Sequence, residues 1–400
     1  MLKKLFISDM HIGDGSAKDD FEYDTELCGL IDDSSQESDV ELVIVGDGIE
    51  ILESRVVKNL GMVPFFELMK KISPDVIDDI FEKHPAVFDS FRRFSKKHKI
   101  VYVVGNHDYY LLANKKLKES LLSRFANIEV VPYYYDPDSG VLAVHGNQFD
   151  VVNKFTFDKK TDSLVPPLGD YISRYMMFNF DEYIQEMVPR ELMRDYDNVR
   201  PILDVFHWFS RAVDIYDLSV NLLEIWTSTF IQMMRSAEAK FWMKKNFPVS
   251  RFMSKVFLNR VGGIKLGQVL VRIIMMLRTM RKTDYLYKVA KDILKNKRTI
   301  TENDLLGYCN GEKIEVGKIL GVVFGHIHHS CFRIVPYDGE KKFYINCGSW
   351  RPVVEKVNGK KKYGFQRKAE LFYAVVRHSP KSGIEIVTNT TNKIVQNGFL

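Results

Sequence analysis

Residues 100–108 read Ile-Val-Tyr-Val-Val-Gly-Asn-His-Asp, and this stretch decides the fold. Its leading residues are all β-branched or aromatic, which is typical of a strand buried on both faces. A glycine ends the run, and Asn106, His107 and Asp108 follow it. Because α/β sheets carry their functional side chains on loops at the carboxyl ends of the strands, we expect these three residues at a functional site.

The same order of apolar strand and then ligand-type side chains recurs four times elsewhere. A lone aspartate or histidine in a loop is usually just solvated, but a set of such loops after apolar strands is hard to obtain by accident. The pattern therefore predicts an α/β protein with its functional site along one rim. The further segments are 5–7 before Asp9 and His11, 42–45 before Gly46 and Asp47, 141–144 before His145, and 322–324 before Gly325, His326 and His328.

The middle of the chain has a different character. Between 153 and 317 the glycine-ended strands give way to apolar residues at helical spacing, as in the stretch 222–230. The simplest organisation is one α/β domain made of residues 1–152 and 318–400, interrupted by a helical insertion over 153–317. Within the first part, residues 51–98 are predicted to form short helices that are broken at Pro64, Pro74 and Pro85.

Composition is that of an ordinary globular protein. The 400 residues are 46% hydrophobic and 27% charged, with a formal net charge of +5. These values exclude wholesale disorder, and the mild charge permits an anionic substrate without demanding nucleic acid. The four cysteines lack the short paired spacings of zinc and redox motifs, which favours reduced thiols in a cytoplasmic protein.

Neither a signal peptide nor a membrane span is predicted. The apolar run at the N-terminus is short, and the best candidate for a span, residues 264–280, is interrupted by Lys265, Arg272 and Arg278.

The donors on the predicted rim suit metal ions. Carboxylates, imidazoles and one amide oxygen, without a thiolate, form a set typical of manganese, iron or zinc. Asp47 has two carboxylate oxygens and could bridge two ions, which together would clamp the attacking and leaving oxygens of a phosphoryl displacement. The sequence thus predicts two divalent metal ions, with manganese favoured.

These motifs resemble the calcineurin-like metallophosphoesterase family. The resemblance rests on Asp9-x-His11, Gly46-Asp47, Gly105-Asn106-His107-Asp108, His145-Gly146 and Gly325-His326-x-His328, in this order and strand context. It implies a four-layer α/β/β/α sandwich and a hydrolase in which a metal-bridged hydroxide attacks phosphorus in line.

The resemblance also implies a role for each residue. Asp9, His11, Asp47 and His328 would hold the first metal, and Asp47, Asn106, His145 and His326 the second. His107 resembles a histidine that contacts the phosphate and helps the leaving group depart, and Asp108 resembles the residue that orients it. Asp150 could support His145, or it could be an ordinary surface carboxylate.

Within the family, the chain is most similar to the UDP-2,3-diacylglucosamine pyrophosphohydrolase group. The likeness lies in Gly46-Asp47-Gly48-Ile49-Glu50 and in Asn346-Cys347-Gly348-Ser349-Trp350. The chain departs from that group in having His107 where those enzymes typically carry arginine, and in its larger insertion. Trp350 and Arg351 are predicted either to line the substrate cleft or simply to pack.

The insertion allows three interpretations. Its aromatic and methionine residues could form the core of a helical bundle, an apolar chamber or membrane-facing surface for an amphiphilic substrate, or an interface with a partner. Basic residues that would help a membrane-facing surface are Lys244, Lys245, Arg251, Lys255, Arg278, Arg281 and Lys282.

Together the motifs predict a cytoplasmic phosphoesterase acting on a phosphodiester or pyrophosphate. A nucleotide-linked lipid is one such substrate, and it would bring peripheral contact with the membrane. The alternative is a manganese-dependent nuclease or nucleotide phosphodiesterase. A scaffold that has lost its chemistry is disfavoured, because the set of ligand residues is complete.

Overall fold

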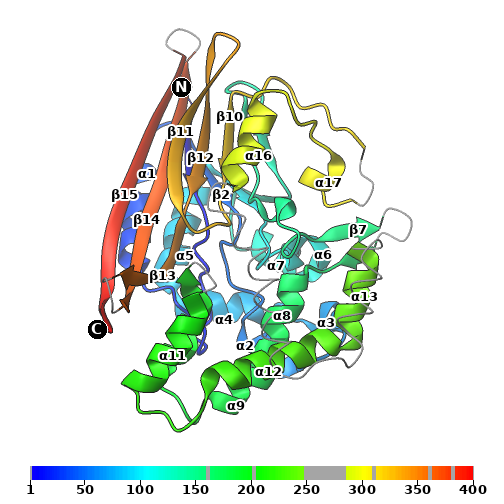
Figure 1. Ribbon diagram of the computed structural model, residues 1–400. Coiled ribbons are helices and arrows are strands. Elements are labelled where there is room, and N and C mark those ends of the chain that lie inside the picture. The colour runs from blue at the N-terminus through cyan, green and yellow to red at the C-terminus, as the bar shows by residue number, and fades with distance from the viewer. Residues whose placement is uncertain are drawn as a thin grey trace.

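A computed structural model describes residues 2–158, 163–200, 204–246, 285–308, 312–358, 363–379 and 383–399. Two mixed β-sheets form its centre, helices pack around them, and a short hairpin lies apart from both sheets (Figure 1). The predicted α/β class is confirmed.

The larger sheet carries the first three rim loops. Its strand order is β4-β3-β2-β1-β14-β13-β9, and β15 pairs with β14. Ile7 lies opposite Ile44 and Val45 opposite Val103, so β1, β2 and β3 are parallel and end at one level. The strands are β1 Lys3–Ile7, β2 Val40–Val45, β3 Lys99–Val103, β4 Ile128–Val131, β9 Val199–Arg200, β13 Ser349–Asn358, β14 Tyr363–Ser379 and β15 Gly383–Phe399.

The smaller sheet carries the other two rim loops. Its order is β11-β12-β10-β6-β5, in which β6 and β10 are parallel neighbours. The loops that start at His145 and Gly325 therefore leave the same edge. The strands are β5 Tyr134–Asp136, β6 Val141–Ala143, β10 Gly321–Phe324, β11 Ser330–Tyr337 and β12 Glu340–Cys347.

Three apolar clusters place the sheets and helices relative to one another. One joins Phe6 and Val43 of the larger sheet to Val323 and Ile345 of the smaller one, so the two sheets share a core. A second lies between the larger sheet and the N-terminal helices, and a third lies between the smaller sheet and α16 (Tyr285–Leu294).

The helices before β6 follow the proline pattern. Pro64 and Pro74 precede the first residues of α3 and α4, and Pro85 is the first residue of α5, so each predicted break is confirmed. These helices are α1 Asp24–Ser34, α2 Arg55–Leu60, α3 Phe65–Lys71, α4 Asp75–Lys83, α5 Pro85–Ser95, α6 Tyr110–Ala113 and α7 Lys115–Leu122.

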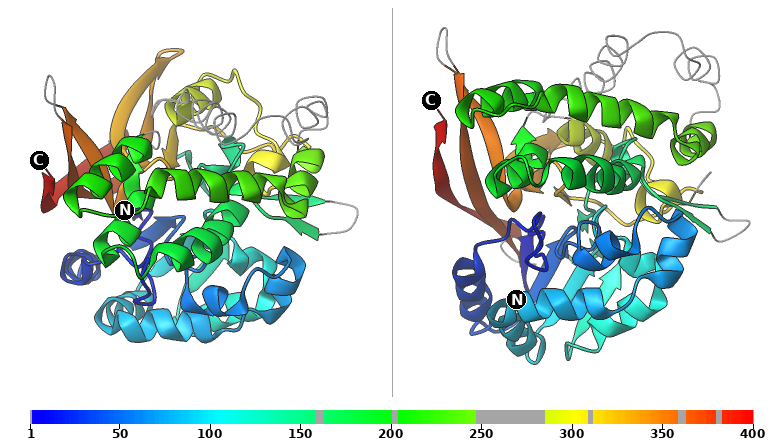
Figure 2. Two further views of the ribbon diagram at one scale, coloured as in Figure 1. Left: turned by 60° about the horizontal axis from the view of Figure 1, so that its bottom comes forward. Right: turned by 90° about the horizontal axis from the view of Figure 1, so that it is seen from below.

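Residues 153–317 are mostly helical in the parts that the structure describes. Figure 2 shows the helices between 168 and 246 (green) lying beside the blue and cyan N-terminal helices. This segment also contains strands, which the sequence reading did not predict. Its elements are β7 Thr156–Asp158, β8 Ser163–Val165, α8 Leu168–Met176, a π-helical turn at Met177–Asp181, α9 Glu182–Ile184, α10 Arg190–Asp195, a 3-10 turn at Tyr196–Asn198, α11 Val205–Ile215, α12 Leu222–Arg235, α13 Ala237–Asn246, α16 and α17 Glu302–Leu305. Another 3-10 turn, Asn147–Phe149, lies just before the segment.

Strand β9 ties this segment to the larger sheet. Val199 pairs with Val354 and Arg200 with Glu355 of β13, in parallel. The segment is therefore not a purely helical insertion, because one of its strands completes the sheet.

Two sequence expectations fall outside the described residues. The apolar stretch 264–280 and the basic residues from Arg251 to Lys282 lie there, and so do the side chains of Lys244 and Lys245 at the end of α13. Among the helices that the structure does describe, none is both long and apolar enough to cross a membrane.

Candidate functional site

Two buried carboxylates lie at the centre of the rim. Asp9 follows β1 and Asp47 follows β2, and both side chains are almost completely buried. The amide of His326 donates to both carboxylate oxygens of Asp9 at 3.2 and 3.0 Å, and the amide of His107 donates to Asp47 Oδ1 at 2.8 Å. Backbone groups of other rim loops thus hold both carboxylates in place.

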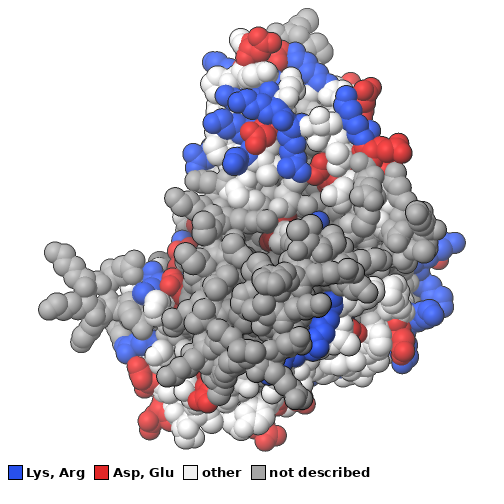
Figure 3. Space-filling model, turned by 45° about the vertical axis from the view of Figure 1, so that its right-hand side comes forward, with Lys and Arg blue, Asp and Glu red and all other residues white. Residues whose placement is uncertain are grey.

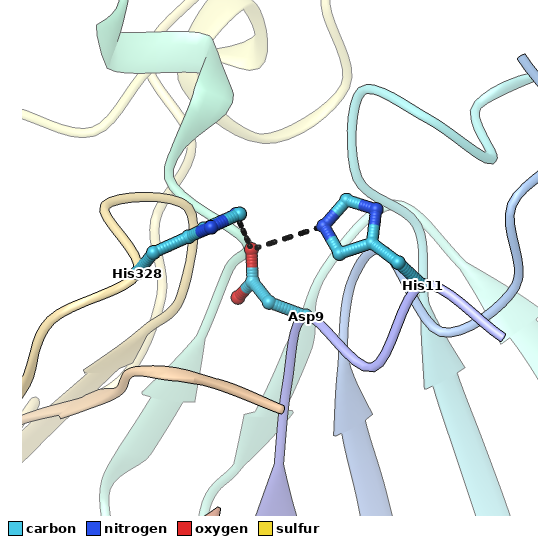
Figure 4. A group of neighbouring side chains, drawn as sticks. All are labelled: Asp9, His11 and His328. Atoms are coloured by element: carbon cyan, nitrogen blue, oxygen red, sulfur yellow. Dashed lines mark ion pairs between the residues drawn. The ribbon is translucent and has the colours of Figure 1, made fainter. Parts of the chain in front are cut away.

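The first histidine group surrounds Asp9. His328 Nε2 lies 3.3 Å and His11 Nε2 lies 4.0 Å from Asp9 Oδ1, with the carboxylate between the two rings (Figure 4). Donor atoms of these three residues all lie within 4.8 Å of one another. The structure therefore brings together three of the four residues predicted for the first metal, and His11 Nε2 also lies 3.8 Å from the fourth, Asp47.

A second group joins Asp9, Asp47 and His145. His145 Nε2 lies 3.1 Å from Asp47 Oδ2 and 4.0 Å from Asp9 Oδ1. Its other ring nitrogen, Nδ1, lies 2.8 Å from the carbonyl of Val45. Because a carbonyl only accepts, Nδ1 carries a hydrogen, and Nε2 is the ring nitrogen that could bind a metal ion after losing its proton.

Several buried donor atoms at the rim have no hydrogen-bond partner in the structure. They are His11 Nε2, His145 Nε2, His328 Nδ1 and the side-chain oxygen Asn106 Oδ1. A buried polar atom without a partner costs about 1–3 kcal/mol, so several of them around two carboxylates need a compensating ligand. Lone pairs of imidazole, carboxylate and amide oxygen are the donors that a divalent transition-metal ion accepts, and the residues fit such ions.

Backbone strain is concentrated at the same residues. Nine non-glycine residues of the described chain have positive φ, and Asp9, His11, Asp47, His326 and His328 are among them, with φ between 48° and 71°. Aspartate and histidine tolerate this left-handed region better than most residues, yet it still costs free energy. Such strain persists where the surrounding structure fixes the geometry, as at ligand sites.

Two glycines allow the loops to approach closely. A Cβ atom at position 105 would overlap Asp47 Oδ1, and one at position 325 would overlap Ser8 Oγ and Asp9 Oδ2. Both glycines follow the predicted strands directly, so the contacts explain why the strand runs end in glycine rather than in another small residue.

The carboxylates favour positive charge at the rim. Burial alone would lower the pKa of His145, but Asp47 and Asp9 raise it to about 9. Burial raises the pKa of Asp47, yet the neighbouring His145 and His107 bring it well below its usual range. Protons and metal ions would therefore compete for this site.

His107 belongs to neither of the two groups around Asp9 and Asp47. Together with His11 and Glu50 it forms a third set, whose donor atoms also lie within 4.8 Å of one another. Burial opposes its charged form, but the Glu50 carboxylate overcomes this and raises the pKa of His107 to about 10. By contrast, burial and the neighbouring His107 lower the pKa of His11 well below its usual value. The structure thus favours a cationic His107 next to a neutral His11.

The structure gives Asp108 other partners than His107, the residue that it was predicted to orient. Asp108 Oδ2 accepts from the amide of Gly48 at 2.9 Å and from the hydroxyl of Tyr102 at 2.6 Å, and Oδ1 accepts from the amide of Gly105 at 2.6 Å. These bonds fix the loops after β2 and β3. The carboxylate next to the His107 ring is that of Glu50, whose Oε2 lies 2.8 Å from His107 Nδ1.

His326 and Asn106 lie at the rim as well, outside the two groups around Asp9 and Asp47. The ring of His326 is 5.3 Å from that of His145, but its Nε2 lies 3.3 Å from Asp150 Oδ2. Asp150 is buried and contacts His326, so it is not the ordinary surface carboxylate that the sequence also allowed. Asn106 is buried, with its side-chain oxygen unpartnered.

Trp350 and Arg351 do not offer their side chains to a cleft. Trp350 is 2% exposed and its indole N–H donates to the carbonyl of Phe372 at 3.0 Å, which places it in the core. The guanidinium of Arg351 lies 3.1 Å from Asp20 and 3.3 Å from Glu53. Their backbone amides support the site instead, because both donate to the carbonyl of Asp9.

Sequence reasoning missed the part played by Glu50 and Ser8. The Ser8 hydroxyl donates to Asp9 Oδ2 and lies 2.7 Å from the carbonyl of Val45. Their places in the sequence could have indicated a role at the site, since Ser8 precedes Asp9 and Glu50 follows Asp47 by three residues.

Comparison with known proteins agrees with this geometry. The family model for calcineurin-like phosphoesterases matches residues 2–207, just over half of the chain. The match contains all the rim loops except the one that carries His326 and His328, which the fold brings to Asp9. None of the curated proteins matches the chain.

A match of this extent, over buried aspartates and histidines arranged to hold metal, means that the chain belongs to the calcineurin-like phosphoesterase family, whose members are metal-dependent phosphoester hydrolases.

Proposed function

We propose that this phosphoesterase uses two divalent metal ions to hydrolyse a phosphodiester or pyrophosphate bond. The observation that carries the proposal is the set of unpartnered donor atoms, from His11, His145, His328 and Asn106, that surrounds the buried carboxylates of Asp9 and Asp47. Asp47 contacts both His11 and His145 through Oδ2, which supports its role as the bridging ligand.

Each residue has a role in this proposal. Asp9, His11, Asp47 and His328 would hold one ion, and Asp47, Asn106, His145 and His326 the other. When bound, the ions would supply an activated water and neutralise charge on the phosphoryl oxygens. His107 would contact the phosphate and give a proton to the leaving oxygen, a role that suits an imidazole held in its charged form by Glu50.

The four-layer α/β/β/α sandwich is proposed as the frame of this site. Its support is the apolar core shared by the two sheets, with separate clusters on the outer face of each sheet. Residues 153–317 would form a cap over the rim. Leu286 of α16 supports this placement, since a Cβ atom added at position 146, next to His145, would lie only 2.9 Å from Leu286 Cδ1.

For the metal we propose manganese, with iron or zinc as alternatives, because the donors are imidazoles, carboxylates and an amide oxygen. For the substrate we propose a nucleotide-linked lipid, on the motif likeness to the UDP-2,3-diacylglucosamine pyrophosphohydrolase group. The protein would then be cytoplasmic and contact the membrane peripherally.

A second candidate is a nuclease or nucleotide phosphodiesterase. Lysine and arginine side chains gather at the top of the molecule, where α16 and the β11–β12 hairpin lie (Figure 3). Lys288 and Lys291 of α16 and Lys297 beyond it are exposed in this region. Such a basic face favours a polyanion, either a nucleic acid or an anionic lipid surface.

The test compares substrates with the purified chain loaded with Mn²⁺. We expect metal-dependent hydrolysis of bis(4-nitrophenyl) phosphate and of a nucleoside-diphosphate lipid, together with co-sedimentation with vesicles of anionic lipid at low salt. Strong cleavage of single-stranded DNA without vesicle binding would favour the nuclease. If chelation leaves the hydrolysis rate of every substrate unchanged, the metal-dependent proposal is wrong.

A further inference from the structure

Glu50 lies between two histidines that have different tasks in the proposed function. Its Oε2 is 2.9 Å from His11 Nδ1, and its Oε1 and Oε2 are 2.9 and 2.8 Å from His107 Nδ1. The two rings are 4.6 Å apart between centroids and nearly perpendicular, at 85°. One carboxylate, itself buried, therefore contacts a metal-ligand candidate and the proposed proton donor at the same time.

This contact fixes which nitrogen of each ring carries hydrogen. An ionised carboxylate only accepts hydrogen bonds, so the Nδ1 atoms of both His11 and His107 must donate. The Nε2 atom of His11 then keeps its lone pair, and it lies unpartnered, 4.0 Å from Asp9 and 3.8 Å from Asp47. The Nε2 atom of His107 is left to face the reacting phosphate in the proposed function.

Glu50 is itself held in position. Its Oε1 accepts from the amide of Glu53 at 3.1 Å. Arg351 Nη1 lies 4.0 Å from its Oε2, and Arg351 is in turn held by Asp20 and Glu53. A buried carboxylate with a fixed cation and several donors around it has little freedom to turn, so it can impose its geometry on the two rings.

The neighbouring carboxylate cannot take this part. Both oxygens of Asp108 are used by the amides of Gly48 and Gly105 and by the Tyr102 hydroxyl. Asp108 thus shapes the loop, while the ring of His107 is oriented from the loop that follows Asp47.

We propose that Glu50 is a shared positioning residue, which orients His11 for metal binding and His107 for proton donation to the leaving group. The inference rests on the proposed function and deepens it. Its consequence is that changes at Glu50 should act on turnover only through these two histidines.

The test is a double-mutant cycle on hydrolysis of bis(4-nitrophenyl) phosphate at saturating Mn²⁺. Glu50→Gln keeps the size of the side chain but presents an amide N–H₂ to one of the two donors. We expect Glu50→Gln to lower kcat by about 10–100-fold, the usual effect of losing a residue that orients a ligand, and to weaken Mn²⁺ binding by a similar factor. His107→Ala should lower kcat by about 10²–10⁴-fold while KM changes little.

The decisive measurement is the double variant, Glu50→Gln with His107→Ala. At saturating Mn²⁺ its kcat should lie within about threefold of that of His107→Ala alone, because Glu50 then has no proton donor to orient. Full additivity of the two losses would overturn the inference, and so would a Glu50→Gln variant with unchanged kcat and unchanged Mn²⁺ affinity.

A matched control separates this effect from general destabilisation. Asp136, in β5 of the smaller sheet, is another buried carboxylate; it pairs with Lys4 at 2.9 Å and accepts from Ser139, and neither histidine is its partner. Asp136→Asn should lower the free energy of unfolding but leave kcat of the folded protein unchanged. If wild-type protein lacks metal-dependent hydrolysis, the proposed function fails; if wild-type is active and only the cycle is additive, this inference alone fails.

Discussion

At the residue scale, the rim depends on backbone conformations and close contacts that few side chains permit. Asp9 and Asp47 have φ near 50°, and the glycines at 105 and 325 pass so close to them that no Cβ fits. Strain of this kind costs about 1–3 kcal/mol for each residue and must be offset by the rest of the fold. The site is therefore costly for stability and sensitive to very small changes.

Gly105→Ala tests this sensitivity. The added methyl group would overlap Asp47 Oδ1 and lie 2.8 Å from the Asp47 amide nitrogen. We expect a loss of about 1–3 kcal/mol in the free energy of unfolding, measured by urea titration, and a marked loss of metal binding. The control is Gly29→Ala in α1, where no atom lies within 4 Å of the added carbon; this change should stabilise by about 0.5–1 kcal/mol. Equal effects of the two substitutions would contradict this explanation.

The residue scale also shows what sequence could and could not predict. Asp9, His11, Asp47, His145 and His328 were predicted from residue type and strand context, and the structure brings them together. The partner of His107 was mispredicted, because Asp108 is adjacent in sequence whereas Glu50 reaches the ring only through the fold. The sequence could not place Trp350 in the cleft or in the core, since a residue just after a strand can lie in either.

At the element scale, α8 holds the loop that carries His107. Asp170 Oδ2 accepts from the hydroxyls of Tyr109 and Tyr110, the residues after Asp108, and Asp170 Oδ1 lies 2.8 Å from Arg174 Nε. Asp170 and Arg174 are both buried. A helix of the segment 153–317 thus fixes the start of α6 through a charged pair.

Asp170→Asn should be strongly destabilising. It leaves the Arg174 guanidinium buried without its counter-charge, and loss of one partner of such a pair costs about 3–5 kcal/mol. Glu67→Gln in α3 is the control, because Glu67 forms an exposed pair with Lys71 at 3.3 Å whose loss should cost at most about 0.5 kcal/mol. Urea unfolding measures both. A loss under 1 kcal/mol for Asp170→Asn would show that this contact does not hold the loop.

His84, between α4 and α5, makes stability depend on pH. Burial would lower its pKa, but the carboxylates of Asp19 and Asp24, 3.5 and 2.8 Å from its two ring nitrogens, raise it above the usual value. Because the folded state holds the proton more tightly, His84 stabilises fully below about pH 6 and less as pH rises through its raised pKa. The stability difference between wild-type and His84→Gln, from urea unfolding between pH 5 and 9, should therefore shrink with rising pH. A difference that grows with pH would contradict this assignment.

The helices and strands with local signals were predictable. Pro64, Pro74 and Pro85 mark the starts of α3 to α5, and the Asp338-Gly339 turn joins β11 to β12, where both residues have positive φ. Strand β9 was not predictable, because two residues are too few to show a strand pattern and they form a strand by pairing with β13.

At the scale of the whole molecule, the segment 153–317 is part of the core. Its aromatic residues share an apolar cluster with Val354 and Phe365 of the larger sheet. Buried ion pairs also join the segment to the sheet, since Asp20 contacts Arg351 and Arg367 on the sheet and Arg194 on α10. Apolar periodicity predicted helices here, but these contacts between distant parts of the chain leave no mark in a local pattern.

The central claim is that Asp47 bridges two metal ions on which hydrolysis depends. The most direct test is elemental analysis of the purified chain and of Asp47→Ala, combined with their rates on bis(4-nitrophenyl) phosphate. We predict two transition-metal ions per wild-type chain, and loss of both metal and activity together in Asp47→Ala, because its carboxylate lies between His11 and His145. Full metal occupancy in Asp47→Ala, or wild-type activity that survives complete removal of metal, would contradict the claim.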